Sequence, residues 1–175
     1  ADHVGTPTAR HHEERIAGGR LVRERQGELR VDRRVTHAHA GARRPDVHRL
    51  GGPEVLSLEQ ADPGEPAAGE ALVRIQAIGL NRSEAVYRSG QYLIPPKLPS
   101  LMGYEACGTL EAVGAGVSGF TVGEPVCVLP NFRMGEYGVY ADRAIVPASS
   151  LVAPPPGLGP IEAASVWMQY FTAFG

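Results

Sequence analysis

The sequence has little of what several protein classes require. Only 2 of its 175 residues are cysteine, which is too few for a disulfide framework. Its apolar stretches are short and are interrupted by glycine, proline or charged residues, so no transmembrane helix is expected. Residues 1–25 lack the apolar core of a secretory signal peptide. We therefore expect a cytoplasmic protein with no membrane partner, and its 43% hydrophobic and 21% charged residues are typical of a globular protein.

Histidine and aromatic residues are each missing from one part of the chain. Residues 1–50 contain all 6 histidines and 11 arginines but no aromatic residue. Without large side chains to bury, residues 1–46 are predicted to be a disordered Arg/His-rich extension, or the product of translation from a start placed too far upstream. Two alternatives are a weak amphipathic helix over residues 13–29 and a nucleic-acid-binding arm. Acidic residues dilute these arginines and outnumber basic residues by 12 to 6 in residues 51–175, so no nucleic-acid partner is expected.

Residues 51–175 combine short apolar stretches with many Gly/Pro turns. Alternating patterns predict four strands, over residues 72–78, 109–113, 126–129 and 138–146. In the first of these, Val73, Ile75 and Ala77 are expected on one face. Helical signals predict two helices, over residues 83–89 and 161–174. Many short strands joined by such turns indicate a small barrel or sandwich.

One glycine motif points to a nucleotide site that its context excludes. Residues 114–119 match G-x-G-x-x-G, and Glu136 follows about 20 residues later, as a dinucleotide-binding loop would have it. Such a loop needs a helix directly after the glycines, because the pyrophosphate rests on the N-terminus of that helix. Here residues 120–125 lead into another strand instead. We interpret the motif as a turn between two strands.

A family resemblance is carried by residues 103–108, Gly-Tyr-Glu-Ala-Cys-Gly, which are followed by a glycine turn at residues 113–117. This arrangement resembles the G-H-E-x-x-G signature of the medium-chain dehydrogenases/reductases. Further segments resemble the family in the same order: residues 48–56, 79–84, 139–142 and 162–172. The resemblance covers residues 47–175.

The resemblance implies a mainly β fold. Residues 47–155 are expected to form a GroES-like (chaperonin-10-like) barrel with short helices, which in the family forms one wall of the active-site cleft. Residues 156–175 are expected to be a linker and the first helix leading into a Rossmann domain, which binds the cofactor in the family and is absent here. We therefore expect a fragment that is inactive alone, and a homo-oligomer in the full-length protein.

The zinc ligands of the family are replaced in this sequence. The zinc enzymes place Cys in the first active-site loop and His in the G-H-E motif, whereas this chain has Asn81 and Tyr104. A neutral amide and a phenol do not replace thiolate and imidazole at neutral pH. No histidine follows His48, and the cysteines of the structural zinc lobe are missing. The sequence therefore resembles the zinc-independent quinone oxidoreductase branch, with no metal site and with Cys107 and Cys127 as buried apolar residues.

This branch implies hydride transfer from NADPH or NADH to a small molecule, namely a quinone, an enone or a related carbonyl compound. The catalytic candidates are Ser83, Tyr92 and Tyr104. The cofactor-binding candidates are Asn81, Gln169 and Thr172, although most of the cofactor site is expected in the missing domain, where NADPH is distinguished from NADH. Glu105 is expected to support its loop rather than to react.

Structural roles compete with these functional assignments. Asn81 could be a turn residue and Ser83 a helix N-cap. Tyr92 could be packed under the neighbouring prolines, and Gln169 and Thr172 could serve core packing or capping. At the level of the whole protein, the alternatives are an alcohol dehydrogenase of the zinc type that has lost its ligands and a non-enzymatic GroES-like binding or scaffold module.

Overall fold

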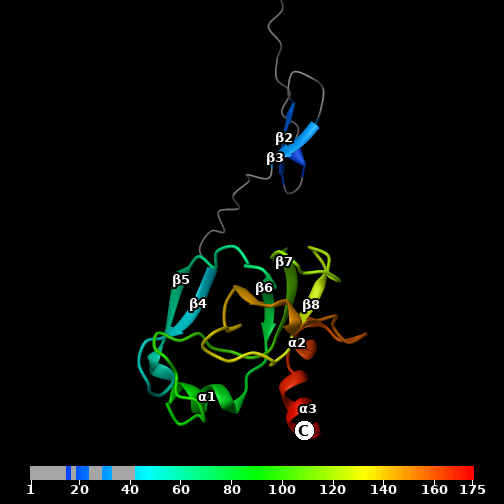
Figure 1. Cartoon of the computed structure of the whole chain (residues 1–175). Coiled ribbons are helices and arrows are strands. Elements are labelled where there is room, and N and C mark those ends of the chain that lie inside the picture. The colour runs from blue at the N-terminus through cyan, green and yellow to red at the C-terminus, as the bar shows by residue number, and fades with distance from the viewer. Residues whose placement is uncertain (1–14, 17–18, 24–28, 33–41) are drawn as a thin grey trace, which may run out of the picture. The chain divides into compact units, whose positions relative to one another are not determined.

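The computed structural model describes residues 15–16, 19–23, 29–32 and 42–175, which fall into two units (Figure 1). The first unit contains an antiparallel sheet in the order β1-β2-β3, formed by β1 (Arg15–Ile16), β2 (Gly19–Arg23) and β3 (Leu29–Asp32). The helix considered over residues 13–29 is therefore wrong for the described residues. Residues 29–32 alternate apolar and charged side chains, which is the period of a strand.

The second unit begins with the described residue Ala42 and contains two sheets. The larger has five antiparallel strands in the order β10-β8-β7-β6-β9. These strands are β6 (Glu70–Ile78), β7 (Ala106–Val113), β8 (Pro125–Val128), β9 (Arg143–Pro147) and β10 (Leu151–Val152). The smaller sheet pairs β4 (Ala42–Val47) with β5 (Leu56–Ala61). Because β4 starts at Ala42, residues 42–46 belong to this unit and not to the extension predicted over residues 1–46. Strands β1, β2 and β3 also differ from the disorder predicted there, and the remaining residues before Ala42 lie outside the described ones.

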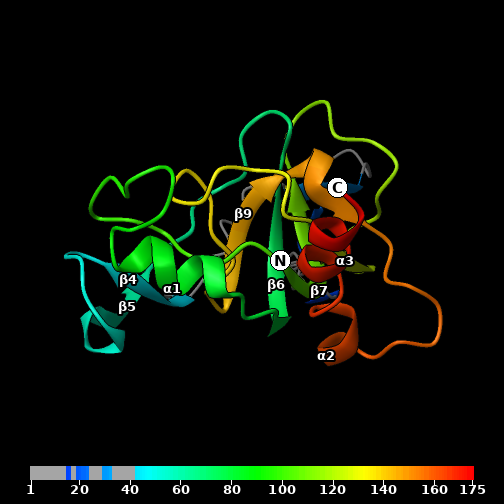
Figure 2. The ribbon, with the colours of Figure 1, turned by 90° about the horizontal axis from the view of Figure 1, so that it is seen from below.

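Helices are few and short. They are α1 (Arg82–Arg88), α2 (Pro160–Ala163) and α3 (Trp167–Phe174), with two 3₁₀ turns, η1 (Pro53–Val55) and η2 (Ala148–Ser150). Helices α1 and α3 lie at the same end of the sheet, at the bottom of Figure 1 and nearest the viewer in Figure 2. No helix among the described residues combines the length and apolar content needed to cross a membrane.

The main core lies between the strands of the larger sheet and the segments that close over it. Its fully buried side chains are mostly valine and leucine: Val73, Leu110, Val126, Val128, Val139 and Val146. In β6, Val73 is buried and Ile75 and Ala77 are half-buried, whereas the side chains between them are exposed, as the alternation predicts. The strands predicted around residues 72–78, 109–113 and 126–129 correspond to β6, β7 and β8. The mainly β fold is therefore confirmed.

Two predicted elements differ from the structure because distant groups take their backbone hydrogen bonds. The strand predicted over residues 138–146 begins only at Arg143, since the N–H groups of Val139 and Tyr140 donate to residues 102–103 and that of Asp142 donates to Arg43. The helix predicted over residues 161–174 divides into α2 and α3. Its break has a cause in the site described below.

The glycine-rich segment of residues 114–119 is a turn between β7 and β8, as interpreted from the sequence. Gly116 and Gly119 have positive φ angles of 79° and 83°, which glycine adopts without steric cost. No helix follows the segment before β8. This segment therefore lacks the helix N-terminus that a dinucleotide-binding loop uses.

Cys107 and Cys127 face each other across β7 and β8 and are both free and buried. They pack with Ala163 and Ala164, so the cysteine pair joins the sheet to α2. Burial raises the pKa of Cys127 to about 12. Both thiols are therefore buried apolar residues, as predicted, and the thiol of Cys127 stays protonated at neutral pH.

Candidate active site

Asn81 occupies the N-cap position of α1, directly after β6 and the turn that follows it. Its backbone N–H donates to the carboxylate of Glu84 three residues later, the Asn-x-x-Glu spacing of a capping box. Ser83 therefore lies inside the first turn, and the alternative that made it the N-cap is wrong. Its hydroxyl is buried and has no hydrogen-bond partner within the described part of the chain.

Glu105 connects Asn81 to the last helix. The carboxylate is fully buried, and its Oε1 accepts a hydrogen bond from Asn81 Nδ2 at 3.0 Å. Its Oε2 accepts from the backbone N–H groups of Trp167 and Met168, at 3.0 and 2.9 Å. In an uninterrupted helix the N–H of Trp167 would donate to Ala163. Glu105 takes this donor instead, which accounts for the break between α2 and α3.

The close approach of these segments depends on Gly79. A Cβ atom at this position would lie 2.4 Å from Glu105 Oε1 and 2.4 Å from the carbonyl oxygen of Ala164. The backbone N–H of Gly79 also donates to the carbonyl oxygen of Glu105 at 3.0 Å. Glu105 therefore supports the loop, as expected from the sequence, and also fixes the start of α3.

Tyr92 and Tyr104 belong to one aromatic cluster. Tyr104 is buried with Tyr87 and Met134, and Tyr92 and Met168 pack at the margin of this group. The rings of Tyr87 and Tyr92 meet edge to face with centroids 6.0 Å apart, so Tyr92 packs on Tyr87. Burial, with the nearby hydroxyl of Tyr92, raises the pKa of Tyr104 above its usual value. Tyr104 is therefore a neutral hydrogen-bond donor at physiological pH.

Gln169 and Thr172 lie on α3 with exposed side chains, so neither packs in the core of the described residues. The hydroxyl of Thr172 donates to the carbonyl oxygen of Met168 at 2.7 Å, within the helix. No direct contact joins either residue to Asn81 among the described interactions. The link between them is indirect, since Glu105 binds both Asn81 and the first turn of α3.

The sequence reasoning missed two polar groups, the buried Glu84 and the half-buried Tyr140. Glu84 is 2% exposed, and burial raises the pKa of its carboxyl despite the N–H of Asn81. Burial and the neighbouring Glu84 also raise the pKa of Tyr140. The Asn-x-x-Glu spacing could have identified Glu84, whereas no local signal places Tyr140 beside it.

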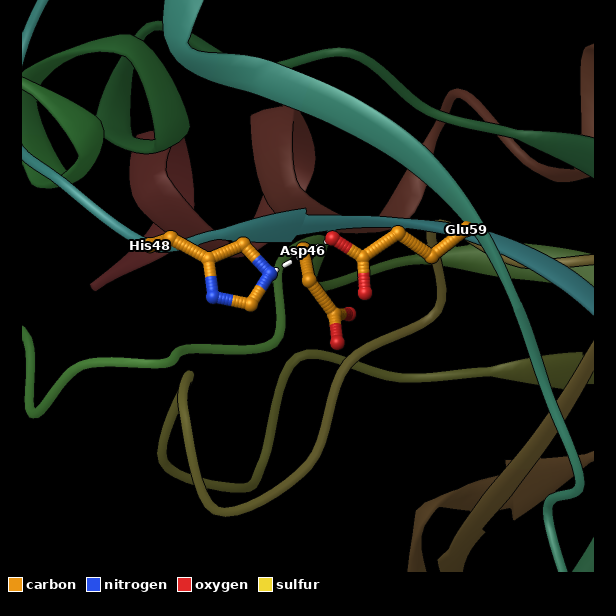
Figure 3. Close-up of side chains that lie close together, drawn as sticks. All are labelled: Asp46, His48 and Glu59. Atoms are coloured by element: carbon orange, nitrogen blue, oxygen red, sulfur yellow. Dashed lines mark hydrogen bonds and ion pairs between the residues drawn. The ribbon is translucent and has the colours of Figure 1, made fainter.

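Asp46, His48 and Glu59 form a second group that the sequence reasoning missed (Figure 3). One ligand-type atom from each lies within 4.8 Å of the others, on and beside the paired strands β4 and β5. His48 Nε2 and Glu59 Oε1 are 2.6 Å apart, and Arg44 forms an ion pair with Asp46 at 2.9 Å. Because a guanidinium already neutralises the most buried carboxylate, the group is an ion-pair cluster and a poor cation site.

A polar cavity of about 270 Å³ lies elsewhere, against β9 and the loop before it. Its charged groups already have partners: Tyr137 donates to Glu70 at 2.8 Å, and Arg143 pairs with Glu111 at 2.7 Å. Asn81 and Tyr104 do not line this cavity. The cavity is therefore not the site that the sequence predicts. The candidate active site is the region of Asn81, Glu105 and Tyr104, where the segments that carry the family motifs meet.

Comparison with known proteins connects this region to a family. The model of the "Alcohol dehydrogenase GroES-like domain" matches residues 67–156, just over half of the chain. A quinone oxidoreductase of Pseudomonas aeruginosa is 39% identical over 131 residues, which cover 75% of this chain and 39% of that protein. Quinone oxidoreductase 1 of Escherichia coli is 41% identical over 113 residues, which cover 62% and 34%.

Solved structures agree with these relatives. The crystal structure of Escherichia coli quinone oxidoreductase complexed with NADPH has a TM-score of 0.68 at 32% identity, covering 75% of this chain and 39% of that one. The human synaptic vesicle membrane protein VAT-1 homolog-like protein has a TM-score of 0.69 at 30% identity, covering 77% and 41%. This chain covers only 34–41% of the length of these relatives. It belongs to the GroES-like domain family of the medium-chain dehydrogenases/reductases.

Proposed function

We propose that this chain forms the GroES-like half of an NAD(P)H-dependent oxidoreductase that reduces a quinone, an enone or a related carbonyl compound. The observation that carries the proposal is the buried contact of Glu105, which joins the Asn81 loop to α3. The names of the relatives, quinone oxidoreductase and 2-haloacrylate reductase, support this class of substrate. The relative solved with NADPH supports a nicotinamide cofactor.

The cofactor would supply the hydride, and this chain would contact one part of the cofactor. Asn81 offers an amide oxygen that Glu105 does not use, and Gln169 and Thr172 offer exposed polar groups on α3. The proposal includes NADH as well as NADPH. We expect most of the cofactor site in the part of the relatives that this chain does not match, so these three residues would form one side of the site.

We propose that no zinc takes part. The two positions that hold zinc ligands in the family carry Asn81 and Tyr104 in this chain. The amide of Asn81 binds Glu105, and Tyr104 is a buried phenol whose raised pKa keeps its proton. Neither group is a good zinc ligand at neutral pH.

Without a metal, the substrate carbonyl would be polarised by neutral hydrogen-bond donors. Tyr104 and Tyr92 are suited to donate to an oxygen that gains negative charge as hydride arrives. Ser83 has a buried hydroxyl with no partner among the described residues, so it is a further donor. Surrounding aromatic side chains would exclude water from the reacting groups.

The proposal is tested by joining this chain, at Gly175, to the part of the Pseudomonas aeruginosa relative that follows the matched region. We expect this fusion to oxidise NADPH in the presence of 1,4-benzoquinone or a simple enone, and a metal chelator to leave the rate unchanged. The bacterial part alone is the control. A fusion that is folded and binds NADPH but reduces neither compound would contradict the proposal, and a chelator-sensitive rate would favour the zinc-type alternative.

Two further features stay predictions. The full-length protein is expected to be a homo-oligomer and to reside in the cytoplasm. Light scattering of the fusion and fractionation of cells that produce the full-length protein would test them.

A further inference from the structure

Glu105 lies directly before β7. Its side chain meets two other segments, the loop after β6 and the first turn of α3. Its carboxylate accepts hydrogen bonds from the Asn81 side chain and from two backbone N–H groups of α3. In Figures 1 and 2, α3 and the helix that Asn81 caps lie at the same end of the larger sheet. Glu105 is fully buried, so these contacts are shielded from water.

We propose that Glu105 is a positioning residue that selects which atom of the Asn81 amide faces the cofactor, and that it does so only while α3 is docked. This inference rests on the proposed function, in which Asn81 contacts the cofactor. A carboxylate can only accept hydrogen bonds, so Asn81 must turn its Nδ2 toward Glu105. The Oδ1 atom lies toward the backbone N–H of Glu84, as the capping box requires, and an amide oxygen can still accept a second hydrogen bond from a cofactor N–H or O–H.

A second carboxylate favours the same orientation. Glu84 Oε1 lies 3.5 Å from Asn81 Nδ2, the same atom that donates to Glu105. The reverse orientation would place Asn81 Oδ1 against two acceptors, which repel it. The amide therefore has one favourable orientation as long as Glu105 stays in place.

Helix α3 in turn holds Glu105 in place. The N–H groups of the first turn of a helix have no partner inside the helix, and its N-terminal end carries partial positive charge. Glu105 Oε2 accepts two of these N–H groups, and the single carboxylate thus joins the helix to Asn81. Any ligand or domain that draws α3 away would release the Asn81 amide, and the position of α3 would control the binding of the cofactor.

Glu105→Gln tests this in the chain itself. Glutamine keeps the shape but replaces one oxygen with an NH₂ group, which meets either Asn81 Nδ2 or the N–H groups of α3 as donor against donor. We expect loss of exchange protection at the Asn81 side-chain amide, or at the backbone N–H groups of Trp167 and Met168, measured by nuclear magnetic resonance. Glu162→Gln, an exposed carboxyl in α2, is the matched control and should change none of these signals.

A rescue variant separates positioning from simple support. In Glu105→Gln with Asn81→Asp, the new carboxylate accepts from the glutamine NH₂, so the glutamine oxygen is free for the N–H groups of α3. We expect protection of these N–H groups to return, even if the single variant does not fold. Unchanged protection in Glu105→Gln, or no recovery in the double variant, would overturn the proposal.

The functional consequence is measured in the fusion. Glu105→Gln is expected to raise the KM for NADPH about tenfold, the effect of one lost hydrogen bond, with kcat changed much less. An unchanged KM would overturn the link to the cofactor. A fusion with Glu105 intact that reduces no quinone or enone would contradict the proposed function, while the resonance experiment still decides the role of Glu105 in orienting Asn81.

Discussion

Two carboxyl groups in the GroES-like domain, those of Glu105 and Glu59, are held in different ways. Glu105 is buried and is held by N–H donors of fixed position, two of which belong to the backbone. Glu59 is part of the cluster on and beside the paired strands β4 and β5, where it binds the exposed side chain of His48. The comparison suggests that donors of fixed position and charge set a geometry, whereas exposed ionisable partners add little stability and respond to salt.

Removal of Glu105 is expected to have the largest effect. Glu105→Leu leaves the amide of Asn81 and the N–H groups of Trp167 and Met168 without their acceptor in a buried site. The free energy of unfolding should fall by about 4 kcal/mol, because each buried unsatisfied donor costs about 1–3 kcal/mol. Chemical denaturation measures this, with Glu162→Leu as the exposed control. A loss no larger than that of the control would remove the contrast between the two groups.

Crowding the same junction is expected to have the next largest effect. Gly79→Ala places a methyl group 2.4 Å from the carbonyl oxygen of Ala164, so the loop or the end of α2 must move. The cost should be about 2 kcal/mol, typical of overpacking. Gly159→Ala is a suitable control, because its new methyl group meets only the flexible end of the Glu162 side chain. Thermal unfolding should separate the two variants clearly, and equal midpoints would contradict the close approach at Gly79.

Glu84 extends the comparison to pH. Burial raises the pKa of its carboxyl above the ordinary value of 4.5, so the folded state holds this proton more tightly than the unfolded state. Its contribution to stability is therefore complete below pH 4.5 and is lost as the pH rises through the folded-state pKa. Glu84→Gln, which stays neutral, should flatten the decline in stability over that range. Denaturation at a series of pH values measures it, and identical profiles would contradict the assignment.

The sequence predicts the barrel strands well, because their alternation of buried and exposed side chains is local. The broken helix was not predictable, since residues 161–174 contain no local breaker and the cause is a carboxylate about sixty residues earlier in the chain, at Glu105. The same holds for residues 139–142, where the N–H groups of Val139, Tyr140 and Asp142 donate to residues 103, 102 and 43 rather than to β6. The position of Asn81 as N-cap was readable from its spacing to Glu84, and the misplaced cap at Ser83 came from overlooking that pair.

The candidate site shows the same division between local and distant signals. Family motifs identify Asn81, Tyr104 and Glu105 as parts of one region, and the structure places Asn81 against Glu105 and Tyr104 beside Tyr92. The sequence could not show that Gln169 and Thr172 make no direct contact with Asn81. It depends on how α3 docks, and that docking depends on the acceptor that Glu105 provides.

Loss of the contact between Glu59 and His48 should have the smallest effect on the free energy of unfolding. Glu59→Gln weakens a half-exposed ion pair with His48, so the free energy of unfolding should change by less than about 0.5 kcal/mol, and high salt should reduce the difference further. Because Arg44 already neutralises Asp46, added Zn²⁺ should leave the melting temperature of the wild-type chain unchanged. A zinc-induced rise that Glu59→Gln abolishes would contradict this, since it would mean that the cation displaces Arg44 from Asp46. The cluster would then be a site of fixed geometry like that of Glu105, and the contrast drawn between the two groups would fail.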